Sequence, residues 1–239
     1  MHGDSIAQAE HAVERILESL VPSDRFTIIK FGDTTESLWE TLAPSIPANR
    51  DVALRFAQTI QASMGSTEIG KALELAYGVL ASEESCDILL VTDGEVSSWE
   101  PIVNRARRSG HRIFTVGVGN AVSEAFVREL ASGTGGECEL VSPREAMAER
   151  IIRHFERMRS PRAENVKINW HRNVIDDYPS TFRTVFDGDT VVGFARFADT
   201  VGPVSVVLEQ QGNIMPINID RLKSRSTTGF IPYSHIRCL

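Results

Sequence analysis

The chain is poor in cysteine and lacks a long apolar run. Three cysteines stand at positions 86, 138 and 238 of 239 residues, with no Cys-x-x-Cys pair. This odd, widely spaced set argues against a disulfide framework. No apolar run approaches the roughly 18 to 20 residues that span a bilayer, and no signal peptide precedes the first helical pattern. We therefore expect no membrane span in this chain.

Metal-ligand and nucleophile patterns are also missing. The six histidines are scattered without metal-ligand spacing, and no Gly-x-Ser-x-Gly elbow occurs. The formal net charge of -7 argues against nucleic acid as an electrostatic partner. What the chain does have is 42% hydrophobic and 24% charged residues, which is the composition of a globular protein with a sizeable core.

Helical and strand-like patterns alternate through the first 160 residues. Strand-like runs at 26–31, 88–91, 113–118 and 139–141 alternate with helical stripes that start near residues 6, 53, 69, 99, 124 and 147. The continuous apolar run at 88–91 is typical of a parallel strand buried on both faces. The order predicts an α/β fold with a doubly wound, mostly parallel, Rossmann-like sheet. Such a sheet opens with a buried strand, so we expect its first central strand to be missing here.

The hydrophobic period changes at Pro161. Val166, Ile168 and Trp170 alternate with polar residues, and Asp187-Gly188 is a hairpin signal. We therefore predict an α/β domain over 1–160 and a small antiparallel β module over 161–220. A basic tail over 221–239 is expected to be poorly ordered.

Two oxygen-bearing side chains lie where open α/β sheets bind ligands, outside the carboxyl ends of strands. Asp93 follows the strongest strand, and Thr67 precedes a helix in the loop Gly65-Ser66-Thr67. A turn aspartate and a helix cap explain the same residues structurally, so position alone leaves both interpretations open. Together, the hydroxyl and the carboxylate could bind a hard cation such as Mg²⁺.

The same loop offers an alternative in a different class of protein. Residues Gly65–Lys71 match the first seven positions of a phosphate-binding P-loop, but position eight is Ala72 instead of Ser or Thr. A P-loop also follows a strand directly, and the residues before Gly65 have a helical pattern. A nucleotide-binding enzyme is therefore the alternative hypothesis.

Taken in order, the motifs resemble a von Willebrand factor type A domain of the inter-alpha-trypsin-inhibitor heavy-chain type, in which a VIT domain precedes the type A domain. They are residues 3–9 and 24–31, GSTEI at 65–69, LLVTDG at 89–94, IFTVGVG at 113–119, and FDGDTVV at 186–192 in the β segment that follows. The resemblance covers about residues 1 to 210.

The resemblance implies a non-enzymatic protein-interaction module with a metal-ion-dependent adhesion site. In relatives, the site holds Mg²⁺, Mn²⁺ or Ca²⁺ and takes a carboxylate from the protein partner. Thr67 and Asp93 match its second and third loops. Its first loop, Asp-x-Ser-x-Ser, occurs nowhere in the 239 residues. We therefore expect a truncated domain with an incomplete metal site. A remnant without independent activity is a further alternative.

The resemblance also bears on stability, association and location. A missing central strand would leave neighbouring strands without ladder hydrogen bonds, so we expect marginal stability and possible self-association through strand edges. Relatives are largely extracytoplasmic or secreted, but this fixes no compartment for the present chain.

Overall fold

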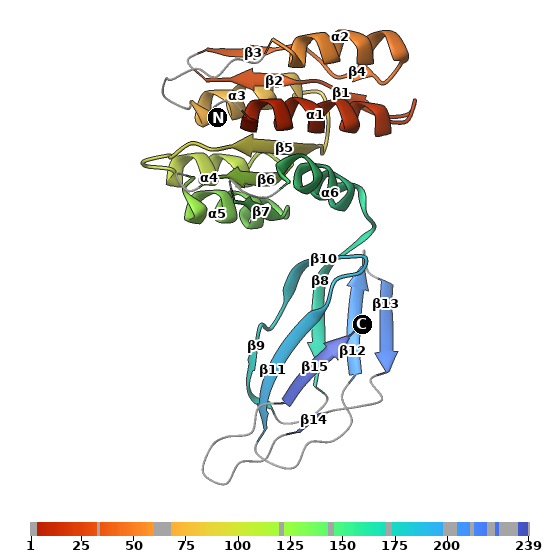
Figure 1. The fold of residues 1–239 in the computed structure, drawn as a ribbon. Coiled ribbons are helices and arrows are strands. Elements are labelled where there is room, and N and C mark those ends of the chain that lie inside the picture. Colours follow the sequence, from red (N-terminus) through yellow and green to blue (C-terminus); the bar gives the residue numbers. More distant parts are fainter. Residues whose placement is uncertain are drawn as a thin grey trace. The chain divides into compact units, whose positions relative to one another are not determined.

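A computed structural model describes residues 4–32, 34–59, 68–119, 122–142, 146–170, 174–197, 205–210, 213–218, 223–224 and 234–238. The chain divides into two compact units, Met1–Arg159 and Ser160–Leu239. The first is built from helices and strands and the second from strands (Figure 1).

The first unit alternates helices with strands. Its helices are α1 (Asp4–Ser19), α2 (Pro47–Ala57), α3 (Ile69–Val79), α4 (Glu100–Arg107), α5 (Glu124–Thr134) and α6 (Met147–Arg159). Its strands are β1 (Arg25–Phe26), β2 (Ile29–Phe31), β3 (Thr35–Ser37), β4 (Ala43–Pro44), β5 (Asp87–Thr92), β6 (Arg112–Val118) and β7 (Cys138–Val141). Helices therefore form at each of the expected stripes.

Strands β5, β6 and β7 form a parallel sheet in that order. Parallel neighbours need crossover connections, and here α4 and α5 supply them. The α/β fold with a parallel sheet is thus confirmed. One expected strand differs: residues 26–31 split into β1, which pairs with β4, and β2, which pairs with β3. The backbone changes partner between Phe26 and Ile29, so no single ladder runs through the segment.

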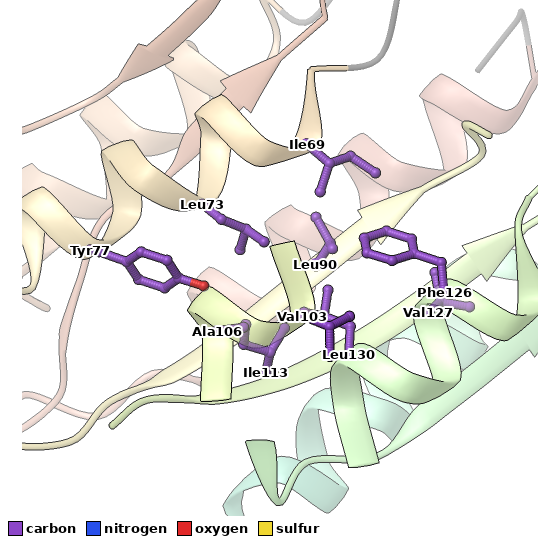
Figure 2. Close-up of a cluster of buried hydrophobic side chains, with 10 residues drawn as sticks. All are labelled: Ile69, Leu73, Tyr77, Leu90, Val103, Ala106, Ile113, Phe126, Val127 and Leu130. Atoms are coloured by element: carbon purple, nitrogen blue, oxygen red, sulfur yellow. The ribbon is translucent and has the colours of Figure 1, made fainter. Parts of the chain in front are cut away.

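Two hydrophobic clusters cover opposite faces of the parallel sheet. On one face, Leu73 of α3, Val103 of α4 and Phe126 of α5 pack with Leu90 of β5 (Figure 2). On the other, Ala12 of α1 and Ile151 of α6 pack with Val116 of β6. Because successive strand residues point to opposite faces, each strand contributes to both clusters.

The burial of β5 differs from the expectation. Residues Ile113–Val118 of β6 are all buried, whereas in β5 only Leu90 and Thr92 are buried. Among the described residues, β5 pairs with β6 alone, whereas β6 has a neighbour on each edge. The apolar run at 88–91 therefore forms a strand but is only partly covered, because coverage depends on a second neighbouring strand.

The second unit consists of two antiparallel sheets. Its strands are β8 (Arg162–Asn169), β9 (Val174–Tyr178), β10 (Phe182–Phe186), β11 (Val191–Phe197), β12 (Ser205–Gln210), β13 (Asn213–Asn218), β14 (Lys223–Ser224) and β15 (Ser234–Cys238). The sheet orders are β10-β8-β12-β13 and β14-β15-β11-β9. The antiparallel strands expected after Pro161 are thus present.

The two sheets of this unit pack face to face. Ile168 and Trp170 are buried, and a Cβ added to Gly193 of β11 would overlap the Cδ1 atom of Ile168. The hairpin signal at Asp187-Gly188 is wrong. Gly188 does form a turn with a φ of 81°, but the strands on either side, β10 and β11, belong to different sheets. A local turn signal does not determine which strands pair.

Two stretches of the expected tail lie in strands. Lys223–Ser224 and Ser234–Cys238 form β14 and β15, and β15 pairs with β11 from Val191↔Cys238 to Ala195↔Ser234. The other residues of 221–239 lie outside the described residues. In the described parts of the chain, no helix has the length and apolar character to cross a membrane.

Candidate functional site

The candidate site lies at the edge where the strands of the parallel sheet end, at Thr92, Val118 and Val141. Ligands of open α/β sheets bind at this edge because the strand-to-helix loops converge there. Asp93 is the first residue after β5, and its side chain is half-buried. Asp93 therefore directly follows strand β5, as the sequence predicts.

The loop that carries Asp93 is fixed at both ends. Thr92 is 2% exposed, and its Oγ1 accepts a hydrogen bond from the Gly94 backbone N–H at 3.2 Å. Further along, Val96 and Trp99 pack against the core cluster, and the Trp99 ring lies 6.3 Å from that of Phe126. Asp93 therefore lies between buried Thr92 on one side in the chain and the partly buried Val96 and Trp99 on the other.

The loop that follows β6 at this edge starts with a hydrogen bond to β7. The backbone N–H of Gly119, directly after β6, donates to the carbonyl oxygen of Val141 at 2.9 Å. This bond extends the pairing of β6 with β7 to the point where both strands end. The ends of β6 and β7 at this edge are thus hydrogen-bonded to each other.

Thr67, the second predicted site residue, lies outside the described residues together with Gly65 and Ser66. The described chain resumes at Glu68, and α3 begins at Ile69, which is 1% exposed. Ile69 belongs to the same cluster as Leu90 of β5 and Phe126 of α5 (Figure 2). The helix that follows Thr67 therefore starts beside the strand that precedes Asp93.

The P-loop alternative finds little support in the described residues. Among the described residues, the last element before Gly65 is helix α2, which ends at Ala57. The Lys71 side chain is 73% exposed, and its Nζ pairs with Glu68 Oε1 at 3.4 Å. A phosphate-binding lysine points into the loop that holds the phosphates, whereas Lys71 lies on the exposed face of α3 beside a carboxylate.

Among the described residues, no three His, Cys, Asp or Glu side chains gather as a metal-binding group. The thiols of Cys86 and Cys138 are half-buried and free. Burial is the main cause that raises the pKa of both thiols, so the protonated form is favoured at neutral pH. Cys86 lies directly before β5 and is only partly covered.

Two histidines, His111 and His154, are buried in the structure. No sequence pattern sets them apart from the other histidines of the chain. His154 on α6 is 4% exposed, and its Nε2 lies 3.0 Å from the Glu137 carbonyl oxygen. Nδ1 of His111 accepts a hydrogen bond from the Cys86 backbone N–H at 3.2 Å. Burial lowers the pKa of both imidazoles. Helical spacing from Met147 through Phe155 places His154 near the apolar face, but it does not reveal the carbonyl partner.

Comparison with known proteins identifies the first unit. The von Willebrand factor type A domain family matches residues 1–156. A von Willebrand factor A domain-containing protein of Dictyostelium discoideum is 28% identical over 95% of this chain and 11% of its own length. Human inter-alpha-trypsin inhibitor heavy chain H4 is 28% identical over 92% of this chain and 25% of its own length. The chain therefore spans about a quarter or less of these relatives.

Solved structures agree with the fold. A von Willebrand factor type A structure from Catenulispora acidiphila has a TM-score of 0.58 at 14% identity, over 88% of this chain and 59% of that one. The conserved hypothetical protein BatB from Bacteroides thetaiotaomicron has a TM-score of 0.52 at 19% identity, over 64% of this chain and 87% of that one. The chain belongs to the von Willebrand factor type A domain family.

Proposed function

We propose that this chain is a non-enzymatic protein-interaction module of the kind found in inter-alpha-trypsin-inhibitor heavy chains. Asp93 and Thr67 are the residues of its adhesion site, and the partner is a protein that offers an acidic side chain. The observation that carries the proposal is the position of Asp93, which is half-buried directly after β5 in a loop held by the Thr92–Gly94 hydrogen bond. The similarity to heavy chain H4 supports it.

The metal site of this chain by itself is proposed to be incomplete. Mg²⁺ requires an octahedral shell of oxygen ligands, and Thr67 and Asp93 supply a minority of them. The loop that would supply an aspartate and two serines does not occur within the 239 residues. Helix α3, which follows Thr67 in the sequence, starts at Ile69 in the same cluster as Leu90 of β5. Partner binding by this chain alone is therefore expected to be weak in the presence of Mg²⁺.

Calorimetric titration of the chain with MgCl₂ tests this proposal. We expect a dissociation constant above about 1 mM, because two oxygen side chains leave most of the cation's shell to water. Asp93→Asn removes the carboxylate charge, and Glu95→Gln is the matched control at an exposed position of the same loop. Micromolar Mg²⁺ binding that is lost in Asp93→Asn and kept in Glu95→Gln would contradict an incomplete site.

Thermal unfolding with ATP separates this proposal from the nucleotide-binding alternative. An interaction module without a P-loop shows the same midpoint with and without ATP and Mg²⁺, because a ligand stabilises only the state that it binds. Protection by ATP that Lys71→Ala abolishes, and that Lys30→Ala leaves in place, would reject a non-enzymatic module.

A further inference from the structure

In the second unit, strand β11 carries its small residues inward and its large apolar residues outward. Successive residues of a strand point to opposite faces of the sheet, and the buried ones in β11 are Gly193 and Ala195. A Cβ added to Gly193 would overlap Ile168 of the other sheet, so the interior leaves no room for a larger residue there. The large apolar residues of β11, Val192 and Phe194, therefore lie on the outer face.

The register of β9 places two more residues on this outer face. Tyr178 lies opposite Phe194, and Asp176 lies opposite Arg196. Residues directly opposite each other in an antiparallel pair share one face of the sheet. We call the five residues Asp176, Tyr178, Val192, Phe194 and Arg196 the β9–β11 face.

The apolar part of the β9–β11 face is open to water. Tyr178 is 76% exposed and Val192 is 39% exposed, and Phe194 is half-buried. Strand β8 of the other sheet has the ordinary alternation, with Val166 buried and Lys167 exposed. Single exposed apolar side chains are common, whereas neighbouring ones indicate an interaction surface. The β9–β11 face is of the second kind.

The charged side chains of this face favour a basic group on the partner. The Asp176 side chain is 71% exposed and that of Arg196 only 31%, and Arg196 Nη2 lies 3.9 Å from Asp176 Oδ2. A charge-assisted hydrogen bond is shorter, at about 2.7–2.9 Å, so the carboxylate can take a closer cation. Tyr178 lies two positions along the same strand, about 7 Å away. Its exposed ring can stack with a guanidinium group.

The shape of the face suits a helix. Strands β9, β11 and β15 are neighbours in one sheet (Figure 1), and a spacing of about 4.8 Å makes three strands about 10 Å wide. An α-helix with its side chains has a similar diameter of about 10–12 Å. An extended segment would instead bind through backbone groups at a sheet edge, whereas this face offers side chains.

We propose that the β9–β11 face binds an amphipathic helix of a partner protein. Apolar side chains of the helix cover Val192 and Phe194, and an arginine beside its apolar stripe stacks on Tyr178 and pairs with Asp176. Five residues are far fewer than the roughly 20–30 that each side of a standard interface contributes, so the complex is transient. The binding does not involve Asp93 and is independent of the proposed adhesion site.

Titration of the whole chain with a designed helical peptide tests the proposal. The peptide has about four turns, with leucines at helical spacing on one face and one arginine beside them. In the control peptide, glutamate replaces the arginine. We expect the NMR amide signals of Tyr178 and Val192 to shift and that of Lys167 to stay in place. The glutamate peptide should bind about tenfold more weakly, because its charge repels Asp176.

Variants of the face separate the ring contact from the charge contact. Tyr178→Ser should weaken binding of the arginine peptide about tenfold, whereas Tyr178→Phe keeps the ring and most of the affinity. Asp176→Asn should reduce the preference for arginine over glutamate to less than about threefold. Lys167→Ser, on the polar outer face of the other sheet, is the control and should bind as the native chain does. Equal thermal midpoints verify that the variants fold.

Four results would each refute the proposal. The first is native affinity of the arginine peptide for Tyr178→Ser, and the second is equal affinity of the native chain for the two peptides. The third is the absence of shifts at Tyr178 and Val192 with either peptide. The fourth is a dimer of the native chain that Tyr178→Ser dissociates, because a second copy would then occupy the face. Sedimentation without peptide identifies this last case.

Discussion

At the scale of single residues, His154 is a titratable group that is 4% exposed and has both a ring contact and a hydrogen-bond partner. Its ring lies edge-on to Phe114 with centroids 5.6 Å apart, and Nε2 donates to the Glu137 carbonyl oxygen at 3.0 Å in the neutral tautomer that this contact requires. Desolvation lowers its pKa, and the Glu137 hydrogen bond opposes that effect only in part. Protonation therefore costs more in the folded than in the unfolded chain.

The pH dependence of stability follows from this shift. The unfolded histidine titrates near 6.5 and the folded one lower, so the unfolded state binds more protons as pH falls below 6.5. The free energy of unfolding contributed by His154 is complete above that pH and is lost as pH falls toward the folded pKa. Urea denaturation measured from pH 7.5 to pH 5 should therefore show a smaller loss of the free energy of unfolding in His154→Gln than in the native chain. Glutamine keeps a side-chain N–H donor but does not titrate. An equally steep loss of stability in the native chain and in His154→Gln would contradict this prediction.

Gly136 and Gly78 differ in the room that each has for an added Cβ atom, so alanine substitutions at the two positions can be compared. A Cβ on Gly136 would overlap the carbonyl oxygen of Ile113, whereas a Cβ on Gly78 in α3 meets nothing within 4 Å. Gly136→Ala should lower the free energy of unfolding by about 1–3 kcal/mol, because backbone must move. Gly78→Ala should raise it by up to about 1 kcal/mol through helix propensity. Equal effects in urea denaturation would contradict the close approach at Gly136.

At the scale of elements, local sequence predicts which segments form strands better than it predicts which strands pair. The apolar run at 88–91 forms β5, and Asp93 follows it as expected. The incomplete burial of Leu89 depends on a neighbour that local sequence does not encode. The hairpin signal at Asp187-Gly188 fails for the same reason. His154 was missed because its partner is a backbone carbonyl, which every residue carries.

The pairing of β5 with β6 has a polar contact at its start. Arg112 donates two hydrogen bonds to the Asp87 carboxylate, from Nε at 2.7 Å and from Nη2 at 2.6 Å. The Arg112 side chain is 12% exposed, so it is less screened by water than a surface pair.

Removal of one partner tests the value of this contact. Asp87→Asn should lower the free energy of unfolding by about 1–2 kcal/mol, because a two-bond, charge-assisted contact to a mostly buried guanidinium is lost. Glu124→Gln breaks the exposed pair with Arg128 and should cost less than about 0.5 kcal/mol. Similar losses for both variants in urea denaturation would indicate that Arg112 is screened as well as Arg128.

At the scale of the whole molecule, the chain has two compact units with separate buried centres. Phe126 is fully buried in the first unit, and Val166 is fully buried in the second. We expect two calorimetric transitions. Phe126→Ala should lower one midpoint, at a cost of about 3–5 kcal/mol, and Val166→Ala should lower the other by less, since fewer atoms are removed. One transition that both variants shift together would mean that the units unfold cooperatively.

The half-exposed apolar side chains of β5 also affect how stability varies with temperature. Unfolding raises the heat capacity mainly by exposing apolar surface to water. Leu89 and Val91 are partly exposed before unfolding, so they add less to that increase than the buried residues of β6. A smaller heat-capacity change flattens the curve of stability against temperature. The incomplete cover of Leu89 and Val91 therefore reduces the sensitivity of the fold to cold.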